Sequence, residues 1–374
     1  MYYFTFSFFT LFAFLSLSGK LRQKTIYGLL LLFAIWMVFH DGLRWGIGTD
    51  WRPYLQFFEN CLWAENEEFE LGYKAVNVWV RSVTDKYSVF LILHAAFIYT
   101  VFYKFIKRYS PFPLMSFLIL YYSMLSYLGM NRQYIAVGFC FLAVPFILKR
   151  EYLKSAILIC AASLFHLSAL MFFVTFLLNR TFKASTLWII LLSALLISIS
   201  GIINKLPLEL FFFLGERAND KLEIYFTEGE AASSLFATLL GIAKRGFWLV
   251  LLLSYYSKIK TSGFSCFDFV FNVYFVALIF YILFSGTILQ FIVARGLIYF
   301  NIFEIIAIPF VFVGLRKKIN RQLLFILLVF LGAYTMERGM DYYKGNHVGE
   351  DIFRPYNAVY MNSDYDATGY TFED

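Results

Sequence analysis

LLLLFAIWMVFHDGLRWGIGTDWRPY, from Leu29 to Tyr54, joins an apolar run to a polar, glycine-spaced and charged segment. The run is long enough to cross much of a bilayer, so the charged residues after it should lie within about one to three helical turns of a membrane surface. The glycines let the backbone turn and approach a ligand closely. The segment from Gly42 is therefore a candidate site, although a juxtamembrane loop whose arginines only anchor a helix end has the same pattern.

The rest of the chain repeats this apolar character. Of its 374 residues, 60% are hydrophobic, 22% are aromatic and only 15% are charged. The apolar runs do not alternate with polar residues as the strands of a membrane barrel do. These features predict an all-α, polytopic membrane protein. We expect about ten transmembrane helices, near residues 2–18, 26–40, 88–103, 112–128, 133–148, 185–203, 234–257, 267–286, 289–313 and 321–336.

Residues 155–179 form a further apolar segment, which we expect to be a re-entrant hairpin with its tip at Ser163 to Ser168. With this hairpin, the short cytoplasmic loops hold 17 of the 32 lysines and arginines, and the outer segments hold 22 of the 25 acidic residues. A single crossing would place the basic loops near Lys258 and Arg316 outside, against the positive-inside rule. The first run carries its basic residues after it rather than before it, so it is a retained span. Both termini are then extracytoplasmic.

Three outer segments follow from this topology: residues 41–87, 204–233 and 337–374. The first contains FELGYKAVNVWVRSV, from Phe69 to Val83, whose pattern is typical of an amphipathic helix on a bilayer surface. The second should be a partly helical cap, and the third is a polar, acidic tail. We therefore expect a single transmembrane domain over residues 1–336, followed by an extracytoplasmic C-terminal tail.

Charge and cysteine patterns exclude several classes of protein. The net charge of +7 comes from charges that mark topology rather than from one soluble basic face, so we expect no nucleic-acid partner. The four cysteines form no CxxC or Cys/His ligand pattern. Neither a metal site nor a cofactor is expected.

Several polar and cationic residues lie where hydrocarbon makes charge expensive, which makes them functional candidates. Arg295 and Arg245 lie inside their spans, while Arg132 and Gln133 begin theirs. With Arg44, they form a possible set on the outer half of the bundle. Guanidinium groups bind phosphate oxygens bidentately and keep their charge when buried, so such a set suits the pyrophosphate of a polyprenyl carrier. The alternative for each arginine is snorkelling or an internal ion pair.

Two residues could accept the proton of a sugar hydroxyl. His166 would lie at the hairpin tip, about 16 Å deep, and the unperturbed pKa of histidine is near neutrality. Alternatively, a lone histidine among apolar residues is only a packing residue. Asp50 lies among glycines and aromatic residues such as Tyr54 that could stack on sugars, or it only caps the helix expected after it.

Five blocks follow one another along the chain: GIGTDWRPYLQFF, FELGYKAVN, the segment from Met130 to Leu170, ARGLIYFNIFEIIAIP and FRPY. In order and spacing they resemble the EpsG family of Wzy-like exopolysaccharide and capsule polymerases. The second block has Glu-Leu-Gly-Tyr where the family pattern is Glu-Pro-Gly-Tyr. The family-like positions are Gly48, Asp50, Tyr54, Glu70, Gly72, Tyr73, Arg132, Gln133, His166, Arg295 and Tyr299.

This resemblance implies a multi-pass protein of the bacterial plasma (inner) membrane that polymerises undecaprenyl-pyrophosphate-linked oligosaccharide repeat units by glycosyl transfer on the outer face. Its expected partners are this substrate, membrane lipid, a flippase and a chain-length regulator. We expect His166 or Asp50 to be the catalytic base. The expected substrate-binding residues are Arg44, Tyr54, Arg132, Gln133, Arg245, Arg295 and Tyr299.

Two other classes of protein remain open at this point. A lipid-linked oligosaccharide flippase or other transporter would need a cavity that opens alternately to both sides, whereas the unusual polar residues concentrate toward the outer half. A membrane O-acyltransferase would fit a single intramembrane histidine. Such an enzyme should take its acyl donor from the cytoplasm, and no cytoplasmic loop here has an obvious length for that task.

Overall fold

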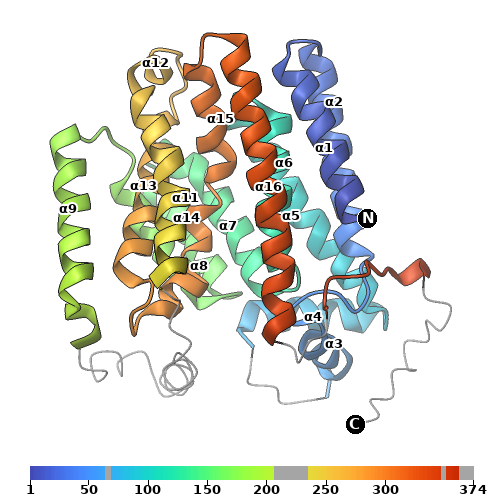
Figure 1. The fold of residues 1–374 in the computed structure, drawn as a ribbon. Helices are drawn as coiled ribbons and strands as arrows, with labels where there is room; N and C mark the ends of the chain where they lie inside the picture. Colours follow the sequence, from blue (N-terminus) through green and yellow to red (C-terminus); the bar gives the residue numbers. More distant parts are fainter. Residues whose placement is uncertain (64–68, 206–234, 347–350, 362–374) are drawn as a thin grey trace. The chain divides into compact units, whose positions relative to one another are not determined.

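The computed structural model describes residues 1–63, 69–205, 235–346 and 351–361 (Figure 1). Within these ranges the chain is mostly helical and contains no β-strand. Five described helices are long and apolar enough to span a membrane, and six further apolar helices are shorter. The expected all-α, polytopic architecture is therefore confirmed. The chain divides into two compact units, which are described separately: unit 1 (residues 1–170 and 315–374) and unit 2 (residues 171–314).

Unit 1 is a bundle of long apolar helices. Helix α2 packs along α5, α1 packs along α6, and α7 contacts both α5 and α8. Helix α6 begins at Pro113, because the fixed φ of proline suits the first turn and its missing N–H is not needed there. The long helices of this unit are α1 (Tyr2–Leu17), α2 (Gln23–Gly42), α5 (Tyr87–Tyr109), α6 (Pro113–Met124), α7 (Asn131–Leu148), α8 (Tyr152–Ser163) and α16 (Lys318–Asn346).

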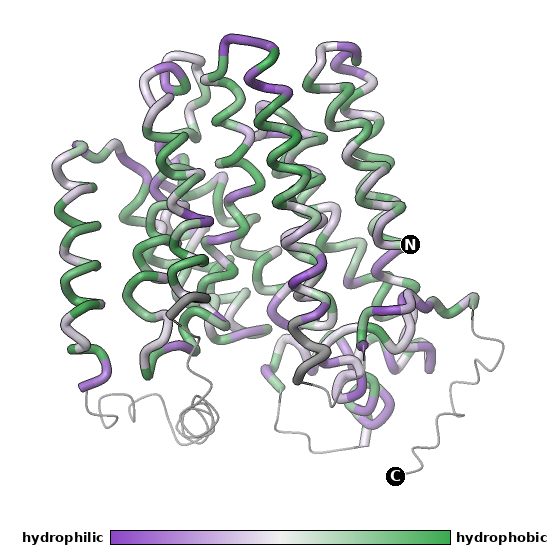
Figure 2. The backbone as a smooth tube through the Cα atoms, viewed as in Figure 1, coloured by the Kyte–Doolittle hydropathy of each residue, from purple (hydrophilic) through white to green (hydrophobic). Residues whose placement is uncertain are grey.

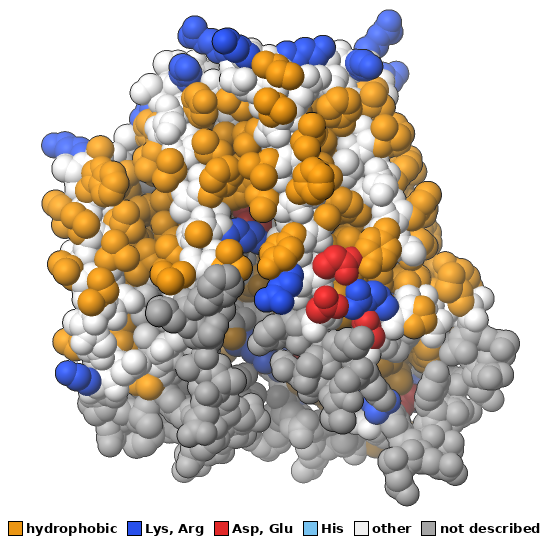
Figure 3. Space-filling view, viewed as in Figure 1, with side chains coloured by type: hydrophobic (Ala, Val, Ile, Leu, Met, Phe, Trp, Pro, Cys, Tyr) orange, Lys and Arg blue, Asp and Glu red, His pale blue; other side chains and the backbone are white. Residues whose placement is uncertain are grey.

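The two ends of unit 1 differ in charge and structure. The α1–α2 loop and the start of α16 lie at one end, where Figure 3 shows lysine and arginine side chains. The short helices α3 (Trp51–Asn60) and α4 (Leu71–Val83) lie at the other end. Figure 2 shows that α3 and α4 mix hydrophilic and hydrophobic residues, whereas the middle of α16 is hydrophobic. The basic loops thus lie opposite α3 and α4, as the charge pattern predicts; which end faces outward stays a prediction.

Helix α4 forms where the sequence predicts an amphipathic helix. It packs on unit 1 through a narrow face that includes Tyr73 and Val80. Its large apolar side chains at Leu71, Trp79 and Val83 are exposed, Val83 to 76%. Exposed apolar residues at the end of a membrane bundle suit a helix that lies in the bilayer interface.

Unit 2 is arranged around α13 (Phe267–Phe284), which contacts α9, α11, α14 and α15. Helix α9 ends at Gly201, whose φ of +63° provides the left-handed conformation that commonly stops a helix. The other elements of this unit are α9 (Ala184–Ser200), η3 (Ile202–Lys205), α11 (Leu235–Ser254), α12 (Tyr256–Lys260), the π-helical turn η5 (Ile292–Gly296), α14 (Ile298–Asn301) and α15 (Glu304–Gly314).

Two segments differ in detail from the expected spans. The span expected over residues 289–313 is broken into η5, α14 and α15, and α16 continues to Asn346, past the expected end at residue 336. Residues 155–179 are broken as a re-entrant hairpin requires: α8 ends at Ser163, and a 3-10 helix, η2 (Leu167–Leu177), follows. Most of the cap expected over residues 204–233 lies outside the described residues.

The end-to-end polarity of unit 1 makes a topology prediction. In a variant whose four native cysteines are replaced, a membrane-impermeant maleimide should label Trp63→Cys in intact cells, because Trp63 is 85% exposed near α3. Arg22→Cys, in the basic α1–α2 loop, should react only after the membrane is opened. Labelling of Arg22→Cys in intact cells would reverse the proposed orientation.

Candidate functional site

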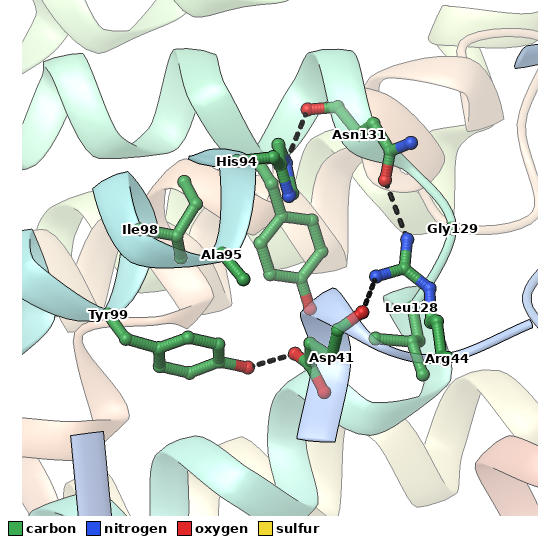
Figure 4. A pocket seen from close by; sticks show the side chains of 10 residues that line it. Asp41, Arg44, His94, Ala95, Ile98, Tyr99, Leu128, Gly129 and Asn131 are labelled. Atoms are coloured by element: carbon green, nitrogen blue, oxygen red, sulfur yellow. Dashed lines mark hydrogen bonds between the residues drawn. The ribbon is translucent and has the colours of Figure 1, made fainter. Parts of the chain in front are cut away.

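The loop after α2 is built around a buried arginine (Figure 4). Arg44 is only 1% exposed. Its Nη1 donates to the backbone oxygen of Asp41 at 2.6 Å, and its Nη2 donates to Oδ1 of Asn131 at 2.8 Å. The guanidinium also lies 5.9 Å from the ring centre of Trp51. In this conformation Arg44 ties the end of α2 to the first residue of α7.

Further polar groups of unit 1 extend this contact into a buried network. Asn131 donates from Nδ2 to the hydroxyl of Tyr87 at 3.0 Å and accepts at its backbone oxygen from Nε2 of His94 at 3.1 Å. The carboxylate of Asp41 accepts from Tyr99 and contacts Nδ1 of His40 at 2.7 Å. The network encloses a cavity of about 10 Å³, which is close to the space that one water needs.

The C-terminal segment covers the loop. The backbone N–H of Trp45 donates to Asn357, and that of Gly48 donates to Ile352. The hydroxyl of Tyr356 donates to the backbone oxygen of His40 at 2.6 Å. The described part of the expected tail is therefore ordered against the loop, which brings the FRPY block to the first block of the sequence.

Arg354 holds this segment through acidic side chains. It binds Asp351 at 2.6 Å, Glu337 at 3.0 Å and also Asp341. Burial favours a raised pKa for Asp351, but hydrogen bonds from the Arg354 side chain and from backbone N–H groups outweigh it, so the pKa lies below the usual aspartate value. This stabilisation is therefore present above the usual aspartate pKa and is lost as the pH falls through the lowered value.

Arg132, in the first turn of α7, is a partly exposed charged group of this region. Its Nε donates to the hydroxyl of Tyr54 at 3.1 Å, and its Nη1 binds Glu70 at 2.7 Å. The guanidinium carbon lies 4.6 Å from the ring centre of Phe69. The side chain remains 18% exposed, and no described residue accepts a hydrogen bond from Nη2. The arginine is thus fixed by its neighbours and still has donor N–H groups to offer.

Helix α4, whose N-cap residue Glu70 binds Arg132, also contacts the segment that follows α8. The N–H of Gly72 donates to the backbone oxygen of Leu164 at 2.8 Å. A Cβ at Gly72 would come within 2.9 Å of that oxygen, so the contact requires glycine. Glu70 and His166 are each two residues from this contact, so their Cα atoms are at most about 20 Å apart.

The two expected bases lie on different segments of the chain. His166 is half-buried between α8 and η2, where its Nδ1 contacts the hydroxyl of Ser168 at 2.7 Å. Asp50 is half-buried in the N-cap position of α3, without a side-chain capping bond. Burial raises the pKa of Tyr54 to about 12, an effect that Arg132 opposes and the charge of Asp50 supports. Asp50 therefore acts electrostatically on the tyrosine that holds Arg132.

Unit 2 holds a second group of the expected residues. Arg245 donates from Nε to Asn301 at 3.1 Å, and its guanidinium carbon lies 4.0 Å from the ring centre of Tyr281. Arg295 is half-buried within the π-helical turn η5. Tyr299, four residues later on α14, is fully buried. Arg245 is thus joined through Asn301 to the helix that carries Tyr299.

The structure sorts the expected residues by accessibility. Arg132, Arg245, Arg295, His166 and Asp50 are partly exposed, whereas Arg44, Tyr54, Gln133 and Tyr299 are buried. Sequence reasoning missed Asp41 and Asn131, which accept the hydrogen bonds of Arg44. The signal was available at Asp41, since an ionisable residue directly after an apolar run has to find a partner.

Comparisons with known proteins give one match. The model described as the EpsG family matches residues 26–357, nearly the whole chain. No curated protein and no solved structure matches.

The buried network makes a stability prediction. Asn131→Leu leaves the guanidinium of Arg44 and the hydroxyl of Tyr87 without their partner, which should cost about 2–4 kcal/mol. The measurement is the thermal unfolding midpoint of the purified protein in detergent. Asn60→Leu is the matched control, because Asn60 is exposed and bonds only its own helix at Gln56. Equal midpoints for the two variants would contradict the network.

Proposed function

Because the chain belongs to the EpsG family of Wzy-like polysaccharide polymerases, we propose that it joins undecaprenyl-pyrophosphate-linked oligosaccharide repeat units at the outer face of the bacterial plasma membrane. In this proposal the protein is a membrane-embedded glycosyltransferase. A flippase would deliver its substrate, and a chain-length regulator would limit its product. The observation that carries the proposal is the fixed, partly exposed guanidinium of Arg132, which Tyr54 and Glu70 hold at the start of α7.

Arg132 suits the leaving group of this reaction. Glu70 and Tyr54 hold two of its nitrogens, so little side-chain entropy is left to lose when a ligand binds. Its remaining N–H groups can donate to a pyrophosphate oxygen, where charge develops as the bond to the sugar breaks. Glu70 also keeps the site from carrying an uncompensated cation when no substrate is bound.

The proposed step balances its atoms as follows. A hydroxyl oxygen of the acceptor sugar attacks the anomeric carbon of the donor, and the bond from that carbon to the pyrophosphate oxygen breaks. The hydroxyl proton goes to His166 or to Asp50, and the bond electrons leave with undecaprenyl pyrophosphate. If Nδ1 of His166 donates to Ser168, its Nε2 is the proton acceptor.

The other expected residues divide into two roles. Arg295 and Arg245 are the proposed phosphate-binding cations of unit 2, since both are partly exposed. Arg44, Tyr54, Gln133 and Tyr299 are buried, so we assign them to positioning the exposed groups rather than to direct contact with substrate. Tyr54 provides the clearest case, because its hydroxyl is bonded to Arg132.

Removal of Arg132 should shorten the surface polysaccharide. In a deletion strain complemented with Arg132→Ala, chain growth should slow by about 10- to 100-fold, the value of one or two charge-assisted hydrogen bonds. Arg132→Lys should retain part of the activity, because it keeps the charge and loses the planar donor geometry. The measurement is the length distribution of the polysaccharide ladder, with membrane protein levels determined in parallel.

Lys154→Ala is the matched control for this series. Lys154 is also cationic and lies on α8, but its side chain is 64% exposed and pairs with the neighbouring Glu151. It should leave the ladder unchanged. A full-length ladder from Arg132→Ala at normal protein levels would remove the main support of the proposal.

The choice of base can be tested by substitution. If His166 is the base, His166→Ala should lower the rate of chain growth by about 100- to 10,000-fold. Asp50→Asn should then keep most of the activity. If Asp50 is the base, the two variants should exchange their effects. Normal rates from both variants would exclude both residues.

A further inference from the structure

Arg132 and Glu70 form an ion pair that is partly open to solvent. Oε2 of Glu70 accepts a hydrogen bond from Nη1 of Arg132 at 2.7 Å, and the two side chains are 26% and 18% exposed respectively. This contact joins one carboxylate oxygen to one guanidinium nitrogen, whereas a guanidinium can bind two oxygens of a phosphate side by side. No described residue accepts a hydrogen bond from Nη2. Arg132 can therefore make more hydrogen bonds to a phosphate than it makes to Glu70.

The position of Arg132 does not depend on Glu70 alone. Its Nε donates to the hydroxyl of Tyr54 at 3.1 Å, and Tyr54 is only 2% exposed. Its guanidinium carbon lies 4.6 Å from the ring centre of Phe69, whose ring centre lies 4.7 Å from that of Phe57. These contacts need no carboxylate, so Arg132 would stay aimed in the same direction without Glu70.

The acceptor of Arg132 differs in kind from the acceptors of the buried Arg44. Both terminal nitrogens of Arg44 donate to neutral groups, the backbone oxygen of Asp41 and the side-chain oxygen of Asn131. Neutral acceptors around a fully buried guanidinium suit a permanent structural contact. Arg132 instead pairs with an anion that water can reach. Such a carboxylate can exchange with another anion.

Glu70 has a second favourable position for its carboxylate. It is the N-cap residue of α4, its backbone is extended, and its side chain makes no capping bond. The N-terminus of a helix stabilises an anion through the helix dipole and the first N–H groups. Because the side chain is also partly exposed, it can turn away from Arg132 without becoming a buried, unpaired charge.

Two polar contacts tie the first turn of α4 to other segments of unit 1. One is the carboxylate of Glu70 on Arg132. The other is the N–H of Gly72, which donates to the backbone oxygen of Leu164 at 2.8 Å. Leu164 lies two residues before His166. Without the Glu70 contact, the hydrogen bond of Gly72 would open more easily, because one of the two fastenings is lost.

We propose that Glu70 is an internal anion that occupies Arg132 until a phosphate of the substrate replaces it. The proposal rests on the proposed function, because that function supplies the phosphate at Arg132. The phosphate first binds Nη2 and then takes Nη1 as well, and the released carboxylate turns toward the N-terminus of α4. The first turn of α4 then loses one fastening, which loosens the segment that carries His166. Glu70 is therefore a positioning residue that couples the mobility of this segment to the occupation of Arg132.

Binding of inorganic pyrophosphate distinguishes this role from that of a simple support. The measurement is isothermal titration calorimetry of the purified protein in nanodiscs, where Arg132→Ala defines the part of the binding that belongs to Arg132. Glu70→Gln removes the competing charge while Tyr54 still holds the arginine, so the Arg132-dependent affinity should rise about tenfold. Glu70→Asp keeps the charge on a shorter side chain and should give an intermediate affinity.

Glu59→Gln is the matched control, because it removes an acidic charge from α3 that interacts with Arg81 rather than with Arg132. It should leave the affinity for pyrophosphate unchanged, and an equal gain in this variant would overturn the proposal. Weaker or unchanged binding by Glu70→Gln would also overturn it, because Glu70 would then only support Arg132. Equal binding by wild type and Arg132→Ala would contradict the proposed function together with the exchange.

Hydrogen exchange measured by mass spectrometry tests the coupling through α4. In wild type, pyrophosphate should speed exchange of the Gly72 amide by up to about tenfold, since the lost ion pair contributes no more than that to the closed state. In Glu70→Gln, exchange should already be faster before pyrophosphate is added and should then stay the same. Glu59→Gln should respond as wild type does. A wild-type Gly72 amide that exchanges equally with and without pyrophosphate would overturn the coupling.

Discussion

The burial of one guanidinium group constrains the end of unit 1 that carries α3 and α4. A guanidinium keeps its charge when it is buried, so removal of the charge of Arg44 from water has to be balanced by acceptors placed around it. The backbone oxygen of Asp41 and the side chain of Asn131 provide them, and the carboxylate of Asp41 supplies a compensating charge nearby. These acceptors come from the end of α2 and the start of α7, so the hydrogen bonds of Arg44 hold these two helix ends together.

This constraint also places the groups that could act on a substrate. Asn131 is followed directly by Arg132, so the contact that satisfies Arg44 fixes the start of the helix that carries the exposed arginine. Gly48 reinforces the arrangement. Its φ is +113°, and a Cβ there would come within 2.5 Å of the backbone oxygen of Leu128. Buried polar residues and a close backbone contact thus hold a site whose chemistry depends on a few partly exposed side chains.

The sequence predicted the helices well because hydrocarbon imposes length and composition on each of them. It predicted α4 and the break after Ser163 for the same reason, since amphipathic period and segment length are local properties. It could not distinguish Arg44 from Arg132, although the structure buries the first and leaves the second partly exposed. That difference depends on Asn131, Glu70 and the docked C-terminal segment, which are far from the two arginines in sequence or carry no pattern of their own.

The sequence also did not predict the irregular helix of unit 2, which has an energetic cost. A π-helical turn at η5 disturbs the regular hydrogen bonds that a backbone needs within a membrane. Gly296 permits this turn by leaving room for Met171, whose sulfur would lie 2.2 Å from any Cβ. An unbroken helix over residues 289–313 would satisfy its own backbone without such a device. The chain instead breaks the helix at Arg295, an ionisable residue within an apolar segment and one of the proposed phosphate-binding cations.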